Sequence, residues 1–192
     1  IATGFTVGFD VLRYALDMLT LGRAQQLLVG CVEELCPQTF LGFQKLGMLA
    51  GGSNGNQEVM QPFNLLRSGF LLGEGAVFFV LEPQDLAQAR RCSKAYGELR
   101  AIVSAIVPSS GTGYDPMGRG LREAIGESLQ AAHLSVDDID CIASSANSSR
   151  PVDCIEAMAL RRLFGKVHHH PIVSCVKSMV GETFSASSFL QI

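Results

Sequence analysis

The stretch SGFLLGEGAVFFVLE, residues 68–82, decides the fold of this chain. Gly73 and Gly75 flank a lone Glu74, and an unbroken apolar run follows at 76–81. Glycine permits a positive φ and a close approach of two backbones, so the pair predicts a tight feature where a strand begins. The run is rich in valine and phenylalanine and is too short for a buried helix. It therefore predicts a strand that is covered on both faces.

The composition is typical of a well-packed globular protein. The chain has 192 residues, of which 47% are hydrophobic and 17% are charged, enough for one domain with a substantial core. The net charge is −3, so nothing in the composition indicates a nucleic acid or an anionic membrane as a partner. No apolar run approaches the length of a membrane span.

The cysteines and the chain ends lead to two further expectations. The six cysteines show no CxxC pair and lie in apolar or helical stretches, so we expect reduced, buried thiols in a cytoplasmic protein. The chain begins at Ile1 without a leader sequence and stops at Ile192 inside an apparent helix. We therefore expect it to be part of a longer chain.

Helical and strand patterns alternate along the sequence. The first half predicts a helix at 8–21, a strand at 27–30, a helical segment at 37–49, a loop at 51–56 and a helix at 86–91. The second half predicts strands at 99–107, 141–144 and 171–175, helices at 121–132 and from 151, and loops at 108–115 and 177–183. This alternation favours a mostly parallel, layered α/β fold.

Three spaced motifs carry a resemblance to a known family. They are QPF at 61–63 with SGFLLGEGA at 68–76, LSVDDID at 134–140, and KSMVG at 177–181. In this order they resemble the signature of the β-ketoacyl synthases, the condensing enzymes of fatty acid and polyketide synthesis. The similarity runs over the whole chain but covers only about half of a family member.

The resemblance implies a thiolase-like layered fold of the α-β-α-β-α type, built from two related halves. Residues 1–92 would then be the end of the first half, and residues 98–192 the start of the second. In this family a cysteine thiolate at a helix N-terminus takes the acyl chain from a carrier protein. Two histidines stabilise the enolate that forms when malonyl-carrier loses CO₂, and a lysine orders the site.

The reacting positions of the family are replaced in this sequence. The cysteine position falls on Phe5, the first histidine on Ser145 and the second on Glu182. Lys177 is retained, and Glu156 resembles its structural ion-pair partner. We expect Glu156 and Lys177 to form a partly buried ion pair, and Phe5 to pack inward against the residues around Ser145 and Glu182.

These replacements predict that the chain has no catalytic residues for condensation. Phe5 offers no nucleophilic atom, and an ionised Glu182 would repel a developing enolate. Loss of a single oxyanion donor typically costs about 2.7–4 kcal/mol of transition-state stabilisation. The pattern resembles a chain length factor, the silent subunit of a ketosynthase pair. The expected partner is an active ketosynthase or a second copy of the chain in a dimer, and an acyl carrier protein is a further candidate. No cofactor and no metal is expected.

Two alternatives remain open at this point. One is an active ketosynthase-fold acyltransferase or thioesterase that uses other residues, and the other is a structural, degenerate domain inside a larger synthase. The cysteines nearest in sequence to the family site are Cys141, Cys154 and Cys175. Cys141 and Cys175 lie in or beside predicted buried strands, where thiols are usually inert.

The remaining motifs are interpreted as structural or solvated. His168–His170 precede a strand and lack the spacing of a zinc site. Arg90–Arg91 and Arg161–Arg162 could meet an acidic carrier protein, but solvated helix faces are the simpler interpretation. Gly52 stands where the family resemblance places a carrier-contacting arginine, which weakens docking through that loop. The glycine-rich segment 109–113 lacks a P-loop lysine and is interpreted as a surface loop.

Overall fold

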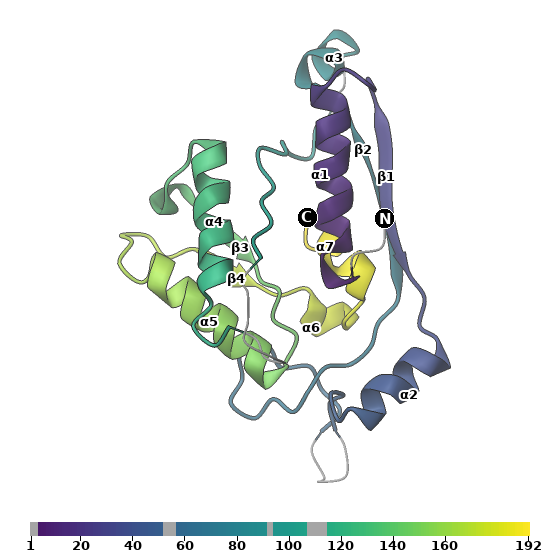
Figure 1. The fold of residues 1–192 in the computed structure, drawn as a ribbon, viewed down its shortest axis with the longest axis vertical. Helices are drawn as coiled ribbons and strands as arrows, with labels where there is room; N and C mark the ends of the chain where they lie inside the picture. The colour runs from purple at the N-terminus through teal and green to yellow at the C-terminus, as the bar shows by residue number, and fades with distance from the viewer. Residues whose placement is uncertain (1–3, 52–56, 92–93, 107–114) are drawn as a thin grey trace.

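The computed structural model describes residues 4–51, 57–91, 94–106 and 115–192. The described helices and strands fall into two groups, joined by the C-terminal segment (Figure 1). The first group holds η1 (Gly4–Thr6), α1 (Val7–Thr20), β1 (Leu27–Glu33), α2 (Pro37–Lys45), β2 (Gly75–Leu81) and α3 (Gln84–Ala89). The second group holds α4 (Arg119–Ala132), η2 (Val136–Asp138), β3 (Cys141–Ala143), α5 (Arg150–Phe164) and β4 (Ile172–Ser174). The C-terminal segment holds α6 (Lys177–Val180), η3 (Phe184–Ala186) and α7 (Ser187–Leu190).

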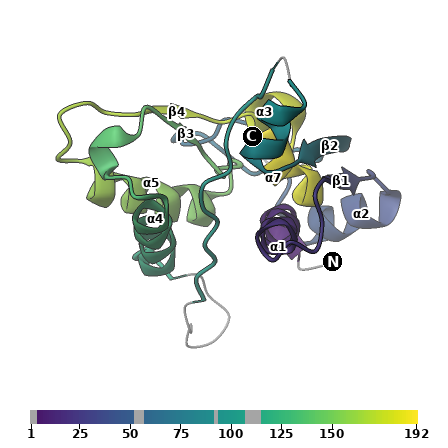
Figure 2. The same ribbon diagram turned by 90° about the horizontal axis from the view of Figure 1, so that it is seen from above.

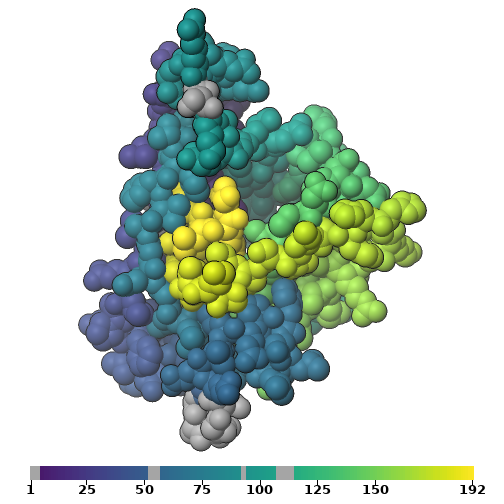
Figure 3. Space-filling view, turned by 180° about the vertical axis from the view of Figure 1, so that it is seen from behind, coloured from purple at the N-terminus to yellow at the C-terminus, as the bar shows by residue number. Residues whose placement is uncertain are grey.

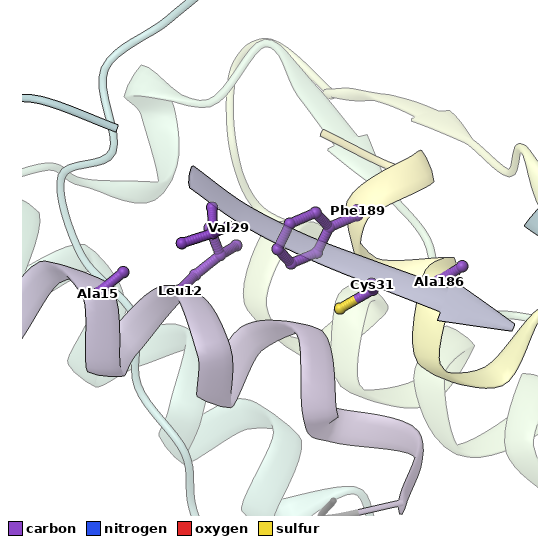
Figure 4. Close-up of a cluster of buried hydrophobic side chains, with 6 residues drawn as sticks. All are labelled: Leu12, Ala15, Val29, Cys31, Ala186 and Phe189. Carbon is purple, nitrogen blue, oxygen red and sulfur yellow. The ribbon is translucent and has the colours of Figure 1, made fainter. Parts of the chain in front are cut away.

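The core of the first group lies between α1 and one face of the β1–β2 pair. The two strands are antiparallel, with Leu27 opposite Leu81 and Glu33 opposite Gly75. Alternate side chains of a strand point to opposite faces, so one face of the pair packs against α1 and α7. The buried side chains of this core are Leu12, Ala15, Val29, Cys31, Ala186 and Phe189 (Figure 4). Full burial of a large apolar side chain contributes about 1.5–3 kcal/mol, so this core anchors the C-terminal segment to the first group.

The other face of the β1–β2 pair is exposed. Leu28 and Val32 of β1 are 71% and 60% exposed, and Phe78 and Val80 of β2 are 57% and 62% exposed. The expectation that the 76–81 strand is covered on both faces is therefore wrong for the described residues. The strand also pairs antiparallel with β1 rather than in a parallel sheet.

The second group places α4 and α5 side by side next to the short parallel pair β3–β4 (Figure 2). Cys141 pairs with Ile172, and Ala143 with Ser174. Both helices were expected from their apolar spacing, and α5 has Pro151 in its first turn, where a missing backbone N–H costs nothing.

Two local expectations are wrong. Residues 99–106 form no strand. A strand needs a ladder partner, and the described sheets consist of the pairs β1–β2 and β3–β4 without this segment. Leu99 and Ile102 pack on the first core instead. The segment expected to be a loop at 177–183 begins with the helix α6. The predicted loops at 51–56 and 108–115 lie, apart from Gly51 and Asp115, outside the described residues.

The C-terminal segment ties the two groups together. Leu72 forms a parallel bridge with Glu182, in which Glu182 N–H donates to the carbonyl of Leu71 at 2.8 Å and Gly73 N–H donates to the carbonyl of Glu182 at 3.0 Å. From behind, this yellow segment lies at the centre of the molecule, between the first group and the green second group (Figure 3). Within the described residues, no helix has both the length and the apolar character needed to cross a membrane.

Candidate functional site

The bridge at Leu72 places Glu182 in the interior. Gly181 has φ +84, and a Cβ at this position would come within 2.9–3.0 Å of the backbone of Gly73. Glycine is therefore required here for the close approach of the two segments. The close backbone approach predicted at Gly73 is confirmed by this contact. It places Glu182, the residue after Gly181, in the space between the two groups.

Glu182 is 1% exposed, and its carboxylate is surrounded by donors. Its Oε2 accepts from Asn147 Nδ2 at 2.8 Å and from Lys177 Nζ at 2.9 Å. Its Oε1 accepts from Ser187 Oγ at 2.8 Å and from the N–H of Phe184 at 3.2 Å. Hydrogen bonds to an ionised carboxylate are strong and satisfy a buried charge. The carboxylate that stands where the resemblance implies the second histidine is thus held by the surrounding structure.

Lys177 is only 6% exposed and pairs with Glu182. The expectation of a direct ion pair with Glu156 needs correction. Ser145 separates the two side chains: its carbonyl accepts from Lys177 Nζ at 3.1 Å, and its N–H donates to Glu156 Oε1 at 2.9 Å. The lysine turns to Glu182 because a second carboxylate, at hydrogen-bond distance, stands where the resemblance implied a histidine.

Glu156 is left with a half-satisfied carboxylate. It is 7% exposed, and its Oε2 has no hydrogen-bond partner among the described residues. Burial raises the pKa of the Glu156 carboxyl, although the Ser145 N–H, the Ser144 hydroxyl and the charge of Lys177 act in the opposite direction.

Arg67 and Asp153 form a second buried ion pair, which the sequence reasoning missed. Arg67 Nε lies 3.2 Å from Asp153 Oδ2, and the two side chains are 8% and 0% exposed. Asp153 also accepts from the N–H of Phe63 at 2.9 Å and from the N–H of Asn147 at 3.0 Å. No local pattern in the sequence indicates that Asp153 has a partner 86 positions away, at residue 67.

Phe5 does not pack inward as expected. It is 61% exposed, and its ring contacts Phe184 edge-on at a centroid distance of 5.2 Å. Phe184 in turn stacks on Phe43 at 5.1 Å, and Phe43 meets the buried Phe70 at 5.3 Å. We call these four residues the aromatic cluster. Phe70 is the buried member of the cluster, Phe43 and Phe184 are half-buried, and Phe5 lies at its exposed outer edge.

The three candidate cysteines occupy different environments. Cys175 is half-buried, donates to the carbonyl of Ala146 at 2.9 Å and has its thiol pKa raised by burial. Cys141 and Cys154 are exposed, which corrects the expectation of buried thiols; β3 leaves Cys141 uncovered, and Cys154 accepts from Arg67 Nη2 at 3.2 Å.

The remaining sequence candidates that the structure describes do not gather into a second site. The residues that the structure describes contain no group of His, Cys, Asp or Glu able to hold a metal ion, and His168–His170 are exposed. Arg90 pairs with Glu82, and Arg161–Arg162 lie exposed on α5. Gly52 and the 109–113 segment lie outside the described residues.

Comparison with known proteins matches both parts of the chain to one family. The model of the β-ketoacyl synthase N-terminal domain matches residues 2–87, and that of the β-ketoacyl synthase C-terminal domain matches residues 96–192. The chain is 31% identical over its full length to a tetracenomycin polyketide synthase ketoacyl synthase alpha subunit of Streptomyces glaucescens, of which it covers 45%. It is 30% identical to an oxytetracycline polyketide putative beta-ketoacyl synthase 1 of Streptomyces rimosus, again over 45% of that protein. The chain thus spans about half the length of these curated relatives.

Solved structures show the same fold. A type II polyketide synthase ketosynthase, solved in complex with its acyl-carrier protein and bound to the hexaketide, superposes with a TM-score of 0.91 at 28% identity. The match covers 100% of this chain and 47% of that one. The ishigamide ketosynthase/chain length factor superposes with a TM-score of 0.85 at 26% identity, over 100% of this chain and 45% of the other. The expected thiolase-like fold, present as about half of a full-length member, is confirmed.

Proposed function

The chain belongs to the β-ketoacyl synthase family, and from this premise we propose that it is a catalytically silent homologue. In this proposal it serves as a partner subunit of an active ketosynthase, in the manner of a chain length factor. The process would be the acyl-carrier-dependent elongation of a polyketide or fatty acid chain, in the cytoplasm. In the same proposal, residues 1–92 form the end of the first thiolase-like half, and residues 98–192 form the start of the second.

The state of Glu182 is the observation that carries the proposal. A group that stabilises an enolate must present a donor or a positive charge to the developing oxyanion. Glu182 presents a carboxylate instead, and four donors hold it in the interior. The same carboxylate neutralises Lys177, so the retained cation is also withdrawn from any substrate.

The aromatic cluster supports a role in binding rather than in chemistry. Phe5 lies in η1, directly before α1, and carries no group that could form a thioester. Its exposed ring extends an apolar surface that begins at the buried Phe70. Such a surface suits contact with an acyl chain or with an apolar part of a partner subunit.

The first test is a condensation assay on the chain alone. With acyl-carrier and malonyl-carrier thioesters, no β-ketoacyl product above background is expected. A triple variant, Phe5→Cys with Ser145→His and Glu182→His, shows whether the scaffold can still support condensation. Product from the unmodified chain would contradict silence, and its loss in Cys154→Ala would favour an acyl-transfer or thioesterase activity based on that exposed thiol.

The second test addresses the partner. The chain is co-expressed with an intact ketosynthase, the mass of the complex is measured by light scattering, and product lengths are analysed. Phe5→Ala is expected to change the distribution of product lengths or weaken the complex. Tyr14→Ala is a matched control, because Tyr14 lies on α1 and is 59% exposed, close to the 61% of Phe5. A monomeric chain that leaves the partner's products unchanged would rule out the partner role.

A further inference from the structure

The face of the β1–β2 pair that points away from α1 is apolar throughout. Alternate residues of a strand share a face, and on this face the cross-strand pairs are Leu28 with Val80, Gly30 with Phe78, and Val32 with Ala76. We call these six residues the outer face. A Cβ at Gly30 would overlap the ring of Phe78, so the ring covers the glycine and the apolar surface is continuous along both strands.

The outer face is open to solvent among the described residues. Its four large side chains are each more than half exposed. Polar side chains lie beyond one end of the face, where Gln26 hydrogen-bonds to Glu82 at 2.6 Å and Arg90 pairs with Glu82. A contiguous apolar patch beside a polar rim is typical of an interaction surface, and strands that are apolar on both faces are typical of a sheet that is covered on both.

The dimensions of the outer face indicate what kind of element covers it. Each strand has seven residues, and strands rise about 3.4 Å per residue and lie about 4.8 Å apart, so the face is a strip about 24 Å long. One helix, about 10 Å wide and rising 1.5 Å per residue, covers such a strip with about 16 residues. The opposite face is covered in this way by α1, which has 14 residues.

A second copy of the chain fits this surface less well. A fully exposed aromatic residue offers about 150–250 Å², so the four partly exposed side chains of the outer face offer roughly 400–500 Å² in total. A standard protein–protein interface buries about 800 Å² per partner. The size of the outer face therefore favours a single helix over the surface of a second copy.

The described part of the chain does not supply such a helix. The elements α1, η3 and α7 pack on the inner face of the strands, and the longest undescribed run, 107–114, is shorter than about 16 residues. The chain covers 45% of the Streptomyces glaucescens relative and 47% of the ketosynthase solved with its acyl-carrier protein. More than half of a family member therefore lies outside these 192 residues and is long enough to provide the helix.

We propose that the outer face binds one amphipathic helix, supplied by a part of the β-ketoacyl synthase domain that lies outside these 192 residues. The helix packs an apolar stripe on Phe78 and its aliphatic neighbours and turns its polar side to the solvent. It covers the outer face as α1 covers the inner one. The proposal rests on family membership and not on catalytic silence, because neither Phe5 nor Glu182 belongs to these strands.

The experiment is reconstitution from separate polypeptides. The 192-residue chain is co-expressed with the parts of the tetracenomycin and oxytetracycline relatives that the matches leave uncovered, each as a tagged polypeptide. We expect one of these parts to co-purify with the chain in a one-to-one complex, measured by light scattering. Val80→Glu places a charge on the outer face and is expected to lower the recovered complex at least tenfold. Leu21→Glu is the matched control, with no change expected, because Leu21 is 65% exposed, close to the 62% of Val80, and lies at the end of α1.

Two further variants keep the test decisive if Val80→Glu folds poorly. Leu28→Glu, on the facing strand, is expected to lower the recovered complex to the same extent. Val80→p-benzoylphenylalanine is irradiated in the complex, and mass spectrometry is expected to find the cross-link in a segment with apolar residues at helical spacing. Absence of a complex, a complex that survives both charged variants, or a cross-link to a second copy or to a segment of alternating pattern would overturn the proposal. The condensation assay tests catalytic silence separately, so the two proposals can fail independently.

Discussion

The two ends of the candidate site accommodate Glu182 and Phe5 in opposite ways. Glu182 is 1% exposed and held by four hydrogen bonds, whereas Phe5 is 61% exposed and contacts the aromatic cluster with one edge. A buried carboxylate is tolerated only when its surroundings satisfy it. A phenyl ring makes no such demand and can remain at a surface. The interior is therefore arranged around the side chain at one end of the candidate site, whereas the side chain at the other end rests on the surface.

We expect the largest loss of stability when the buried ion pair of Lys177 and Glu182 is broken. Lys177→Met leaves the carboxylates of Glu182 and Glu156 without a nearby cation. Removal of one partner of a buried pair typically costs about 3–5 kcal/mol, so we expect a loss of this size in the free energy of unfolding, measured by urea denaturation. Lys45→Met, at an exposed lysine of α2, should change it by less than about 0.5 kcal/mol. Equal effects of the two substitutions would show that the pair does not stabilise the fold.

The raised pKa of Glu156, at the buried end of the site, makes the stability of the chain depend on pH. Burial raises the pKa of Glu156, so the folded chain binds this proton more tightly than the unfolded chain does. The resulting stabilisation is fully present below the ordinary glutamate pKa of about 4.3 and is lost as the pH rises through the raised folded-state pKa. Each tenfold difference in proton affinity corresponds to about 1.4 kcal/mol.

Glu156→Gln is expected to remove this fall in stability. Unfolding free energies of both chains are measured from about pH 4 to about pH 8. The value for the unmodified chain should fall relative to that of the variant as the pH rises through the titration of Glu156, and the difference should be constant elsewhere. Asp153 and Lys177, the charged neighbours that act on Glu156, are present in both chains. Parallel curves over the whole range would contradict the raised pKa.

A smaller effect is expected at the exposed end. Phe5→Ala removes an edge contact with Phe184 but little buried area, so the loss should be about 0.5–1.5 kcal/mol, the range of a single aromatic pair. Phe70→Ala, at the 1% exposed centre of the aromatic cluster, should cost about 3–5 kcal/mol. Thermal or urea unfolding of the two variants shows whether the buried member of the cluster contributes more to stability than the exposed one. Similar losses would mean that Phe5 is buried in solution.

The smallest effect is expected at Ser145. Its contacts with Lys177 and Glu156 run through its carbonyl and its N–H, and the residue is exposed. Ser145→Ala keeps both backbone groups, so stability should change by less than about 0.5 kcal/mol. A loss above 1 kcal/mol in urea denaturation would show that the hydroxyl itself supports the site.

Much of the fold could be predicted because its signals are local. The helices at Val7–Thr20 and Arg119–Ala132 follow from apolar spacing along one face, and the strand at Gly75–Leu81 from a short apolar run. The strand expected at 99–107 shows the limit of such signals. Its apolar pattern suits pairing, but pairing depends on whether another strand lies alongside, and the described sheets, β1–β2 and β3–β4, do not include this segment.

The candidate site was predictable in its residue types but not in its contacts. The sequence by itself determined that Phe5 has no nucleophile and that Ser145 and Glu182 stand where the resemblance implies histidines. Only the tertiary structure decided that Lys177 pairs with Glu182, that Glu156 keeps a free oxygen, and that Phe5 stays at the surface. The physical reason is that the chemistry of a side chain is a property of the residue, whereas its charge partner and burial depend on which distant segments fold against it.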